Sequence, residues 1–104
     1  MNVDIKTTIQ EENGKVIAFL EGRFDTVASS VVEKALAPLF ECKDKEIILD
    51  CSGLTYIASA GLRLFLSVLK SAQGNGSKVF IRGINDHLRT VFAMTGFINI
   101  FKFI

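Results

Sequence analysis

The spacing of apolar residues changes several times along the chain, and each spacing predicts a different element. Alternation over residues 3–10 predicts a strand with one buried face, and the more continuous apolar run at residues 15–21 predicts a central strand. Between them, residues 11–14 end in Asn-Gly, a pair that tolerates the positive φ angles of a tight hairpin turn. Apolar runs at residues 46–50, 78–82 and 98–104 predict three further strands.

Helical spacing is clearest after residue 58. Residues 51–53 form a polar link containing glycine, and a helix is predicted to begin at or just after Ser59 and to stop at residues 74–77. At about 100° per residue the helix has an apolar and a polar side. The apolar side consists of Leu62, Phe65, Leu69 and Ala72. The polar side consists of Ser59, Arg63, Ser67 and Lys70.

Two other segments also have helical spacing. One helix is predicted to begin near Val27 with Thr26 as its N-cap and to kink or end near Pro38, which removes a backbone hydrogen bond. Its apolar stripe is Val27, Val31, Ala35 and Leu39, with Val32, Leu36 and Phe40 beside it. A further helix is predicted over residues 84–95, with Gly96 at its C-terminal end.

The order of these elements predicts the fold class. Each strand–helix–strand segment requires parallel neighbours joined by a right-handed crossover, whereas the opening hairpin adds an antiparallel edge. We therefore expect one α/β domain over residues 1–104, with a mixed, mostly parallel sheet of about five strands and helices packed mainly on one face. A chain of 104 residues, 49% of them apolar, is enough for one core but not for two.

Two polar residues at predicted helix starts have alternative interpretations. Ser59 is either an N-cap, whose oxygen accepts from a free backbone N–H, or a regulatory hydroxyl that a kinase can reach. Both roles can hold together, and a phosphate there would meet the positive end of the helix and Arg63. Asp25 is likewise either a helix-start cap or a residue that contacts a partner.

Composition and charge exclude several function classes. The net charge of +1 comes without a basic stripe, which argues against direct binding of nucleic acid, and no apolar run is long enough for a membrane span. Cys42 and Cys51 lack metal-ligand spacing, so we expect free thiols in a reducing compartment and no metal or cofactor. His87 stands alone and no GxSxG motif is present, so we expect no enzyme. The polar N-terminus carries no secretory signal, which predicts a cytoplasmic protein.

Three segments carry a resemblance to a known family. The segment ILDCSGLTYIASAGLRLFL, residues 48–66, resembles the signature of STAS domains, above all of the bacterial anti-sigma factor antagonists. Residues 22–26, Gly-Arg-Phe-Asp-Thr, resemble the turn that lies beside the phosphorylated serine of that family. Residues 89–103, RTVFAMTGFINIFKF, resemble its C-termini, so the resemblance covers nearly the whole chain.

The resemblance implies a phosphorylation-switched binding module. Ser59 occupies the position of the serine that is phosphorylated in members of this family. The kinase is the partner anti-sigma factor, a serine kinase of the histidine-kinase-like ATPase class. The residue before this serine is often Asp or Ser in the family, and here it is Ala58. With Ser59 unphosphorylated, the chain would sequester the anti-sigma factor and so free a sigma factor, and a phosphatase would restore it. The alternative is a non-enzymatic STAS subunit of a transport or signalling complex, in which Ser59 is only a helix cap.

The same resemblance assigns a set of residues to the partner surface. We expect Asp25, Ala58, Ser59, Gly61 and Arg63 to lie together on one exposed end of the domain, because loops after parallel strands cluster where such sheets bind partners. The full expected set is Gly22, Asp25, Thr26, Ile57, Ala58, Ser59, Ala60, Gly61 and Arg63, with Ser59 as the phosphorylated residue.

Overall fold

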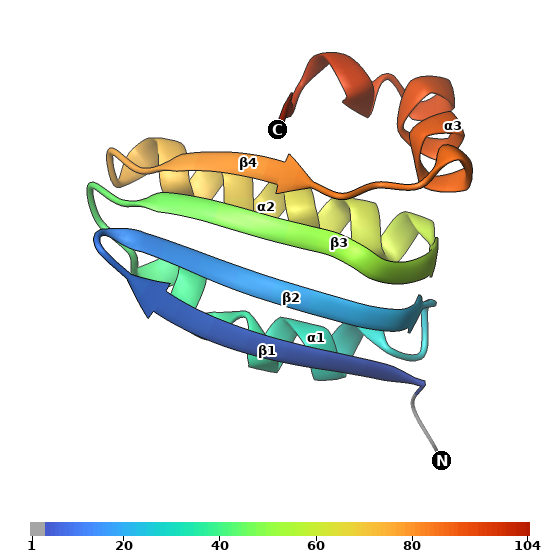
Figure 1. The fold of residues 1–104 in the computed structure, drawn as a ribbon, viewed down its shortest axis with the longest axis horizontal. Coiled ribbons are helices and arrows are strands. Elements are labelled where there is room, and N and C mark those ends of the chain that lie inside the picture. Colours follow the sequence, from blue (N-terminus) through green and yellow to red (C-terminus); the bar gives the residue numbers. More distant parts are fainter. Residues whose placement is uncertain (1–3) are drawn as a thin grey trace.

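A computed structural model describes residues 4–104, which form a five-stranded sheet in the order β1-β2-β3-β4-β5 (Figure 1). The β1–β2 pair is antiparallel and every other neighbouring pair is parallel, which confirms the predicted mixed α/β sheet. Val3, placed in the first predicted strand, lies outside the described residues. The elements are β1 (Ile5–Glu12), β2 (Lys15–Phe24), α1 (Ser29–Ala35), the 3₁₀ helix η1 (Ala37–Glu41), β3 (Glu46–Ile57), α2 (Ser59–Gly74), β4 (Lys78–Arg82), α3 (Asp86–Thr95), the 3₁₀ helix η2 (Phe97–Asn99) and β5 (Lys102–Phe103).

The hairpin and the longest helix follow the sequence pattern closely. The turn between β1 and β2 holds two residues, Asn13 and Gly14, and both have positive φ, 49° and 80°, as the twist of a tight hairpin favours. Helix α2 begins at Ser59 and ends at Gly74, as predicted. Among residues 4–104, no helix combines the length and the apolar character needed to cross a membrane.

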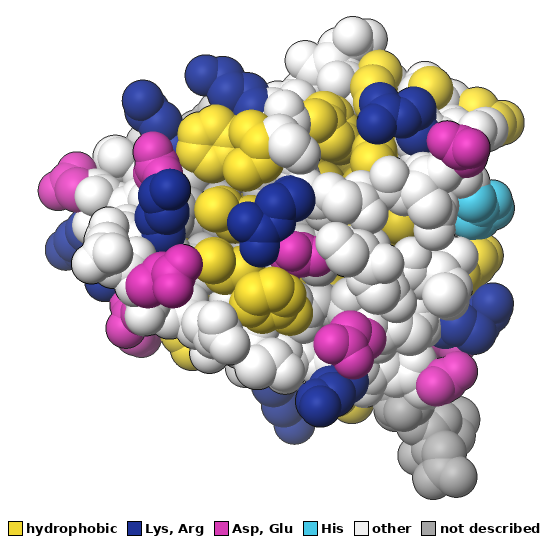
Figure 2. Space-filling view, viewed as in Figure 1, with side chains coloured by type: hydrophobic (Ala, Val, Ile, Leu, Met, Phe, Trp, Pro, Cys, Tyr) yellow, Lys and Arg dark blue, Asp and Glu magenta, His cyan; other side chains and the backbone are white. Residues whose placement is uncertain are grey.

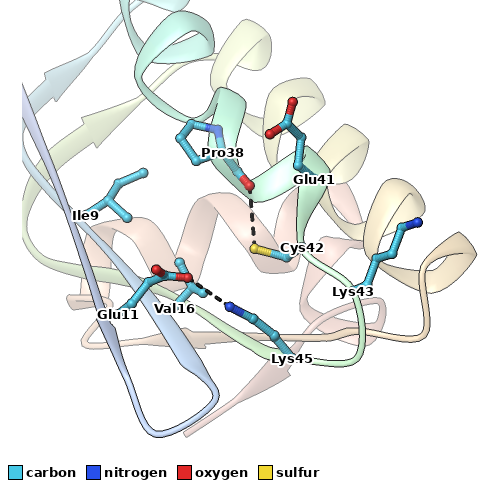
Figure 3. Close-up of a pocket in the computed structure, with 8 residues that line it drawn as sticks. All are labelled: Ile9, Glu11, Val16, Pro38, Glu41, Cys42, Lys43 and Lys45. Atoms are coloured by element: carbon cyan, nitrogen blue, oxygen red, sulfur yellow. Dashed lines mark hydrogen bonds and ion pairs between the residues drawn. The ribbon is translucent and has the colours of Figure 1, made fainter.

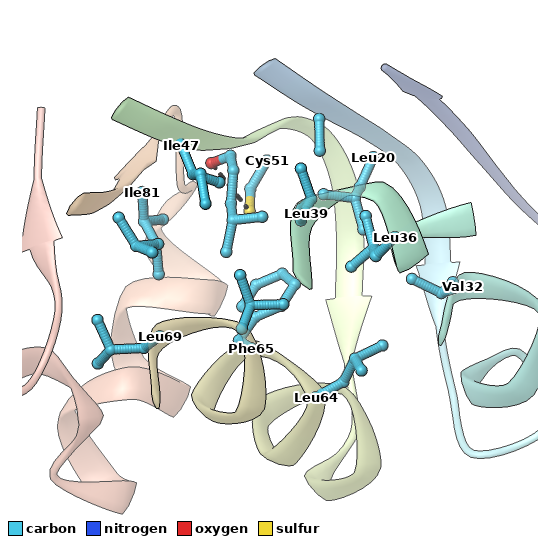
Figure 4. Close-up of a cluster of buried hydrophobic side chains, with 14 of the residues drawn as sticks. Leu20, Val32, Leu36, Leu39, Ile47, Cys51, Leu64, Phe65, Leu69 and Ile81 are labelled. Carbon is cyan, nitrogen blue, oxygen red and sulfur yellow. Dashed lines mark hydrogen bonds between the residues drawn. The ribbon is translucent and has the colours of Figure 1, made fainter. Parts of the chain in front are cut away.

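Helices α1 and α2 cover one face of the sheet, and the core lies between this face and the two helices (Figures 1 and 4). Alternate strand residues point toward these helices, among them Leu20 on β2 and Ile47 on β3, while Phe65 of α2 reaches the core from the other side. The whole predicted apolar side of α2 is buried, and its polar side is exposed. The helical stripe read from the sequence is therefore confirmed.

The opposite side of the sheet carries no helix over its centre, and we call it the open face (Figure 2, viewed as in Figure 1). It is formed by the alternate strand residues that point away from α1 and α2. Its central residues are Ile17 and Phe19 on β2, Ile48 and Asp50 on β3, and Phe80 and Arg82 on β4.

Strand β3 is longer than predicted. The sequence places a polar link at residues 51–53, but β3 continues through it to Ile57, so that prediction is wrong. The pairing of β3 with β4 stops at Asp50, and beyond this point β3 pairs only with β2, with two register shifts. Helix α3 contacts β3 and occupies the side that β4 leaves empty (Figure 1). The link residues are therefore extended because β2 holds them in the sheet, which local composition does not reveal.

Helix α1 differs from the prediction in its start and in its buried face. It begins at Ser29, after a turn, and it buries Ala28, Val32 and Leu36. The predicted stripe is wrong at Val27 and Val31, which are 50% and 47% exposed, whereas its member Leu39 is buried. The predicted break near Pro38 is confirmed, since α1 ends at Ala35 and Pro38 lies in the first turn of η1.

The C-terminal segment is only partly a strand. The sequence predicts a strand over residues 98–104, but η2 occupies residues 97–99 and β5 consists of Lys102 and Phe103 alone. Gly96 ends α3 with a φ of 80°, as expected of a C-terminal glycine. Phe92 of α3 packs edge to face against Phe101 and Phe103, with ring centroids 6.3 and 5.6 Å apart, so aromatic packing rather than a long ladder holds this segment.

An ion pair closes the β3–β4 ladder on the open face. Arg82 donates from Nε to Oδ2 of Asp50 over 2.8 Å, its Nη2 lies 2.8 Å from the same oxygen, and the Ser52 N–H donates to Oδ1 over 2.9 Å. Burial alone would raise the pKa of the Asp50 carboxyl, but the Ser52 hydrogen bond and the Arg82 guanidinium outweigh it and hold that pKa below its usual value.

This lowered pKa makes the acid stability of the fold depend on Asp50. The carboxyl of an unfolded aspartate titrates near pH 4 (about 3.9), so ionised Asp50 stabilises the fold above that pH, and the contribution is lost as pH falls through the lower folded pKa. We expect Asp50→Asn to lose less stability than the parent as the pH falls below about 4. Thermal unfolding at stepped pH measures the difference, and parallel curves for variant and parent would contradict it.

Candidate functional site

The candidate site lies where β2 and β3 end side by side. Phe24 pairs with Ile57 at the last position of the register, and the Ala58 N–H donates to the Phe24 carbonyl over 2.8 Å. The next residues along each chain segment are Asp25 and Ser59. The two residues are therefore brought to the same end of the sheet, on the right in Figure 1, as the sequence predicts.

Ser59 is the first residue inside α2 and is exposed. The N-cap is Ala58, with extended backbone angles φ −92° and ψ 170°, so the N-cap interpretation of Ser59 is wrong. Helix α3 shows the contrast, because there Asn85 is the N-cap and its Oδ1 accepts from the Leu88 N–H over 2.8 Å. The Ser59 hydroxyl thus stands at the positive end of a helix without serving as its cap.

Asp25 binds the turn before α1, where the sequence placed Thr26 as the helix cap. Its Oδ1 accepts from the Ala28 N–H over 2.9 Å and closes the turn before α1, whereas the exposed Thr26 offers its backbone carbonyl to the Ser29 hydroxyl over 2.8 Å. The N-cap of α1 is Ala28 and receives no side-chain cap hydrogen bond, so the helix-cap interpretations of Asp25 and Thr26 are both wrong, and Asp25 instead closes the preceding turn. Because the Asp25 side chain is only half-buried, a partner could still contact it.

Two residues of the expected surface are buried instead. Ile57 is 3% exposed, and Gly61 is buried on the inner side of α2, so the expectation that Gly61 is exposed is wrong. A Cβ added at Gly61 would lie 2.8 Å from Ile57 and 3.1 Å from the Phe24 ring. These residues hold the start of α2 against the ends of the strands, and so they position the exposed Ser59.

Gly22 lies at the same end and has a structural task. Its φ is 105°, and an added Cβ would lie 2.3 Å from the Asp4 carbonyl oxygen, which accepts a hydrogen bond from the Arg23 N–H over 2.8 Å. The Gly22 carbonyl accepts from the Thr55 hydroxyl over 3.0 Å. The glycine therefore lets the start of β1 and the far end of β3 approach β2 closely.

Arg63 and Ala60 line a hollow of about 300 Å³ between α2 and α1. Arg63 is exposed one turn after Ser59, as predicted. The other lining residues are Ser29, Ser30 and Glu33 of α1 and Leu64 and Ser67 of α2. The sequence did not single out the α1 residues, because the stripe predicted for that helix was wrong. The hollow adds polar groups of both charges beside Ser59.

Sequence reasoning also missed a stack of three side chains at this end. The Arg23 guanidinium lies 4.3 Å from the centre of the Tyr56 ring, and the His87 ring stacks on Tyr56 with centroids 6.4 Å apart. Arg23 and Tyr56 are register partners only because β3 extends past Asp50. His87 is exposed in the first turn of α3.

The two cysteines of the chain are buried thiols. Burial raises the pKa of the Cys51 thiol to about 12 and also raises the pKa of Cys42, which keeps both thiols protonated and weakly nucleophilic. Both cysteines are unpaired, as predicted. Within residues 4–104, no group of three His, Cys, Asp or Glu side chains is placed to hold a metal ion.

A second hollow, of about 630 Å³, opens at the other end of the sheet (Figure 3). Its apolar floor includes Ile9, Val16 and Pro38, and Lys45 donates to Glu11 over 2.9 Å across it. Because β2 and β3 both begin here, the hollow lies a full strand length from Ser59. It therefore belongs to a different surface from the candidate site.

Comparison with known proteins gives one consistent family. The family model described as "STAS domain" matches residues 5–104. The "Putative anti-sigma factor antagonist BtrV" of Bordetella bronchiseptica is 32% identical over 93% of this chain and 84% of that protein. The "Anti-sigma-B factor antagonist" of Staphylococcus aureus is 29% identical over 92% of this chain and 87% of that protein. The solved structure of the Bacillus cell fate determinant SpoIIAA in its phosphorylated form has the same fold, with a TM-score of 0.71, 16% identity, and coverage of 95% of this chain and 91% of that one.

Proposed function

Because this chain belongs to the STAS domain family, we propose that it is an anti-sigma factor antagonist switched by phosphorylation of Ser59. The observation that carries the proposal is the position of Ser59, exposed at the first residue of α2 and not used as the helix cap. In this role Ser59 is the substrate of a partner and not a nucleophile. The surface that binds the partner comprises the exposed residues around it, with Gly22, Ile57 and Gly61 as its support.

The switch we propose is electrostatic. Phosphorylation adds about −1.5 to −2 charge at neutral pH, and the helix N-terminus together with Arg63, one turn away, tolerates that charge within the fold. A partner that packs over Ser59 would instead have to remove a dianion from water, which is strongly unfavourable when no counter-charge meets it. The unphosphorylated chain therefore binds the anti-sigma factor, and the phosphorylated chain releases it.

The proposal includes the enzymes that set the switch. The anti-sigma factor itself is the kinase, of the histidine-kinase-like ATPase class with ATP and magnesium, and a separate phosphatase removes the phosphate. We place this exchange in the cytoplasm, because the unpaired thiols of Cys42 and Cys51 suit a reducing compartment. When the chain binds the anti-sigma factor, the sigma factor that the anti-sigma factor would otherwise bind is set free.

The direct test is incubation with a candidate anti-sigma factor and ATP, followed by intact-mass measurement. We expect the parent to gain one phosphate and Ser59→Ala to gain none. Ser67→Ala is the matched control, because Ser67 is exposed two turns further along the same side of α2, and it should be phosphorylated like the parent. A phosphate on another residue, mapped by peptide mass, would overturn the assignment.

Variants at Ser59 should separate partner binding from stability. Ser59→Asp carries a carboxylate into the interface and should weaken binding of the anti-sigma factor by about tenfold or more, equal to about 1.4 kcal/mol. Ser59→Ala adds no charge and should bind like the parent. Since Ser59 is exposed and is not the cap, both variants should unfold within about 0.5 kcal/mol of the parent. Calorimetric titration and thermal unfolding give the two readings.

The control for charge alone is Ser67→Asp, which adds the same carboxylate to the same helix two turns away. This variant should bind the anti-sigma factor more tightly than Ser59→Asp does. The alternative function, a STAS subunit of a transport or signalling complex, predicts that an anti-sigma factor neither binds the chain nor modifies it. Equal binding by Ser59→Asp and the parent, with no phosphate transfer, would therefore count against the proposed switch.

A further inference from the structure

The open face has an apolar centre. In the β2–β3–β4 register, Ile17, Ile48 and Phe80 are neighbours on one level, and Phe19, Asp50 and Arg82 are neighbours on the next. Ile17 and Ile48 are only 6% and 4% exposed although no helix covers them. Phe19 and Phe80 remain partly exposed.

The one ion pair at this centre is internally neutralised. The Asp50 carboxylate is bound by Arg82, whose guanidinium lies 6.0 Å from the centre of the Phe19 ring. In Figure 2 the hydrophobic side chains run across the middle of the face, interrupted by one basic and one acidic side chain, while most charges lie at its border. A sheet face of this kind suits contact with another apolar surface more than contact with water.

A row of alternating charges borders this centre. In register, Glu12 of β1, Lys15 of β2, Glu46 of β3 and Lys78 of β4 follow one another across the sheet, so their signs read minus, plus, minus, plus. Lys15 and Glu46 are 3.9 Å apart, with side chains 51% and 48% exposed, and both can therefore make additional contacts.

A row with this pattern is complementary to itself when reversed. Suppose that two open faces meet about a two-fold axis that runs parallel to the strands. Each row of register partners then faces the same row of the other copy, with the strand order reversed. Lys15 of one copy then faces Glu46 of the other, and Glu12 faces Lys78. The same rotation places Ile17 of one copy opposite Ile48 of the other. The border charges and the Ile17–Ile48 level therefore match in a single arrangement, in which Phe19 of one copy faces Asp50 of the other.

We propose that the open face binds a second copy of this chain, with the two-fold axis running along the strands. The sheets would stack about 10 Å apart, as in a β-sandwich. The patch is roughly 15 Å by 17 Å, much smaller than the about 800 Å² that each partner buries in a standard interface. We therefore expect a weak dimer, whose fraction rises with protein concentration. The axis keeps strand direction, so both Ser59 residues lie at the same end of the dimer, and the helical faces point outward. This inference is independent of the proposed function.

Sedimentation velocity over a concentration series tests the dimer. We expect reversible self-association of the parent that weakens as salt is raised. Lys15→Glu and Glu46→Lys should each weaken it by about tenfold or more, because like charges then face each other twice across the axis. An equimolar mixture of these two variants should associate again, since every charge of the reversed row meets its opposite.

The matched controls make the same charge changes away from the open face. Lys43→Glu and Glu41→Lys alter exposed residues in and after η1, and they should leave self-association at the parent level. Thermal unfolding of all variants verifies that each is folded. A parent that stays monomeric at every concentration would overturn the proposal and assign the face to a different occupant. A mixture that stays monomeric, or controls that weaken the dimer equally, would also overturn it.

Discussion

Replacing Phe65 with alanine is expected to lower the free energy of unfolding by about 3–5 kcal/mol, the cost typical of a fully buried aromatic residue. Phe65 is 0% exposed in the middle of α2 (Figure 4). It meets Phe24 edge to face, with ring centroids 5.9 Å apart. Its removal leaves a cavity between the sheet and α2 and loosens Phe24, which packs beside Gly61 at the candidate site. Denaturant unfolding monitored by circular dichroism measures the loss.

The control lies on the same helix. Lys70 is exposed on the opposite side of α2, and Lys70→Ala should change stability by less than about 0.5 kcal/mol. Both substitutions place the strong helix former alanine in α2, so helix propensity adds little to the difference between them. A Phe65→Ala loss below about 0.5 kcal/mol would show that the helix packs on a different face.

Gly22→Ala is expected to cost about 2–5 kcal/mol, because it combines a strained backbone with a steric clash. At a φ of 105° an alanine is unfavourable in any surroundings, and here its Cβ would also lie 2.3 Å from the Asp4 carbonyl oxygen. Backbone atoms give way at greater cost than side-chain ends, so β1 would have to shift at its start. Thermal unfolding gives the loss, and hydrogen exchange should show it concentrated at the β1–β2 pair.

Gly14→Ala separates the two contributions. Gly14 also has positive φ, 80°, but no atom lies within 4 Å of a Cβ added there. Its substitution should therefore cost only the backbone strain of about 1–2 kcal/mol. If Gly22→Ala costs no more than Gly14→Ala, the close approach of Asp4 is not a constraint on the fold. Gly22 would then be free to act at the partner surface directly.

The parts of the fold that local periodicity determines could be predicted from the sequence. Helix α2 has one apolar and one polar side, and β4 is a short apolar run between a glycine-rich loop and Gly83, so both were predicted with the observed bounds. In α1 the pattern is ambiguous, because Val27 and Val31 are as apolar as the buried Val32 and Leu36 beside them. The apolar pattern alone therefore does not decide which stripe faces the sheet.

The candidate site shows the same division. The exposure of Ser59 and Arg63 follows from the helical pattern, and the placement of Asp25 and Ser59 at the same end of the sheet follows from parallel strands. The stack of Arg23, Tyr56 and His87 depends on pairing between β2 and the second half of β3, across a register that shifts twice. Such pairing joins residues more than thirty positions apart, and no local signal encodes it.

The short strand β5 has a consequence for the helix that precedes it. By pairing Lys102 with Phe80 and Phe103 with Ile81, it closes the segment from Gly83 to Phe101 into a loop whose two ends are both fixed to β4. A closed loop has less conformational entropy to lose than a free tail, so α3 is ordered at a smaller cost than a dangling helix would be. Two strand residues thus act as a tether that holds His87 against Tyr56 at the far end of the sheet.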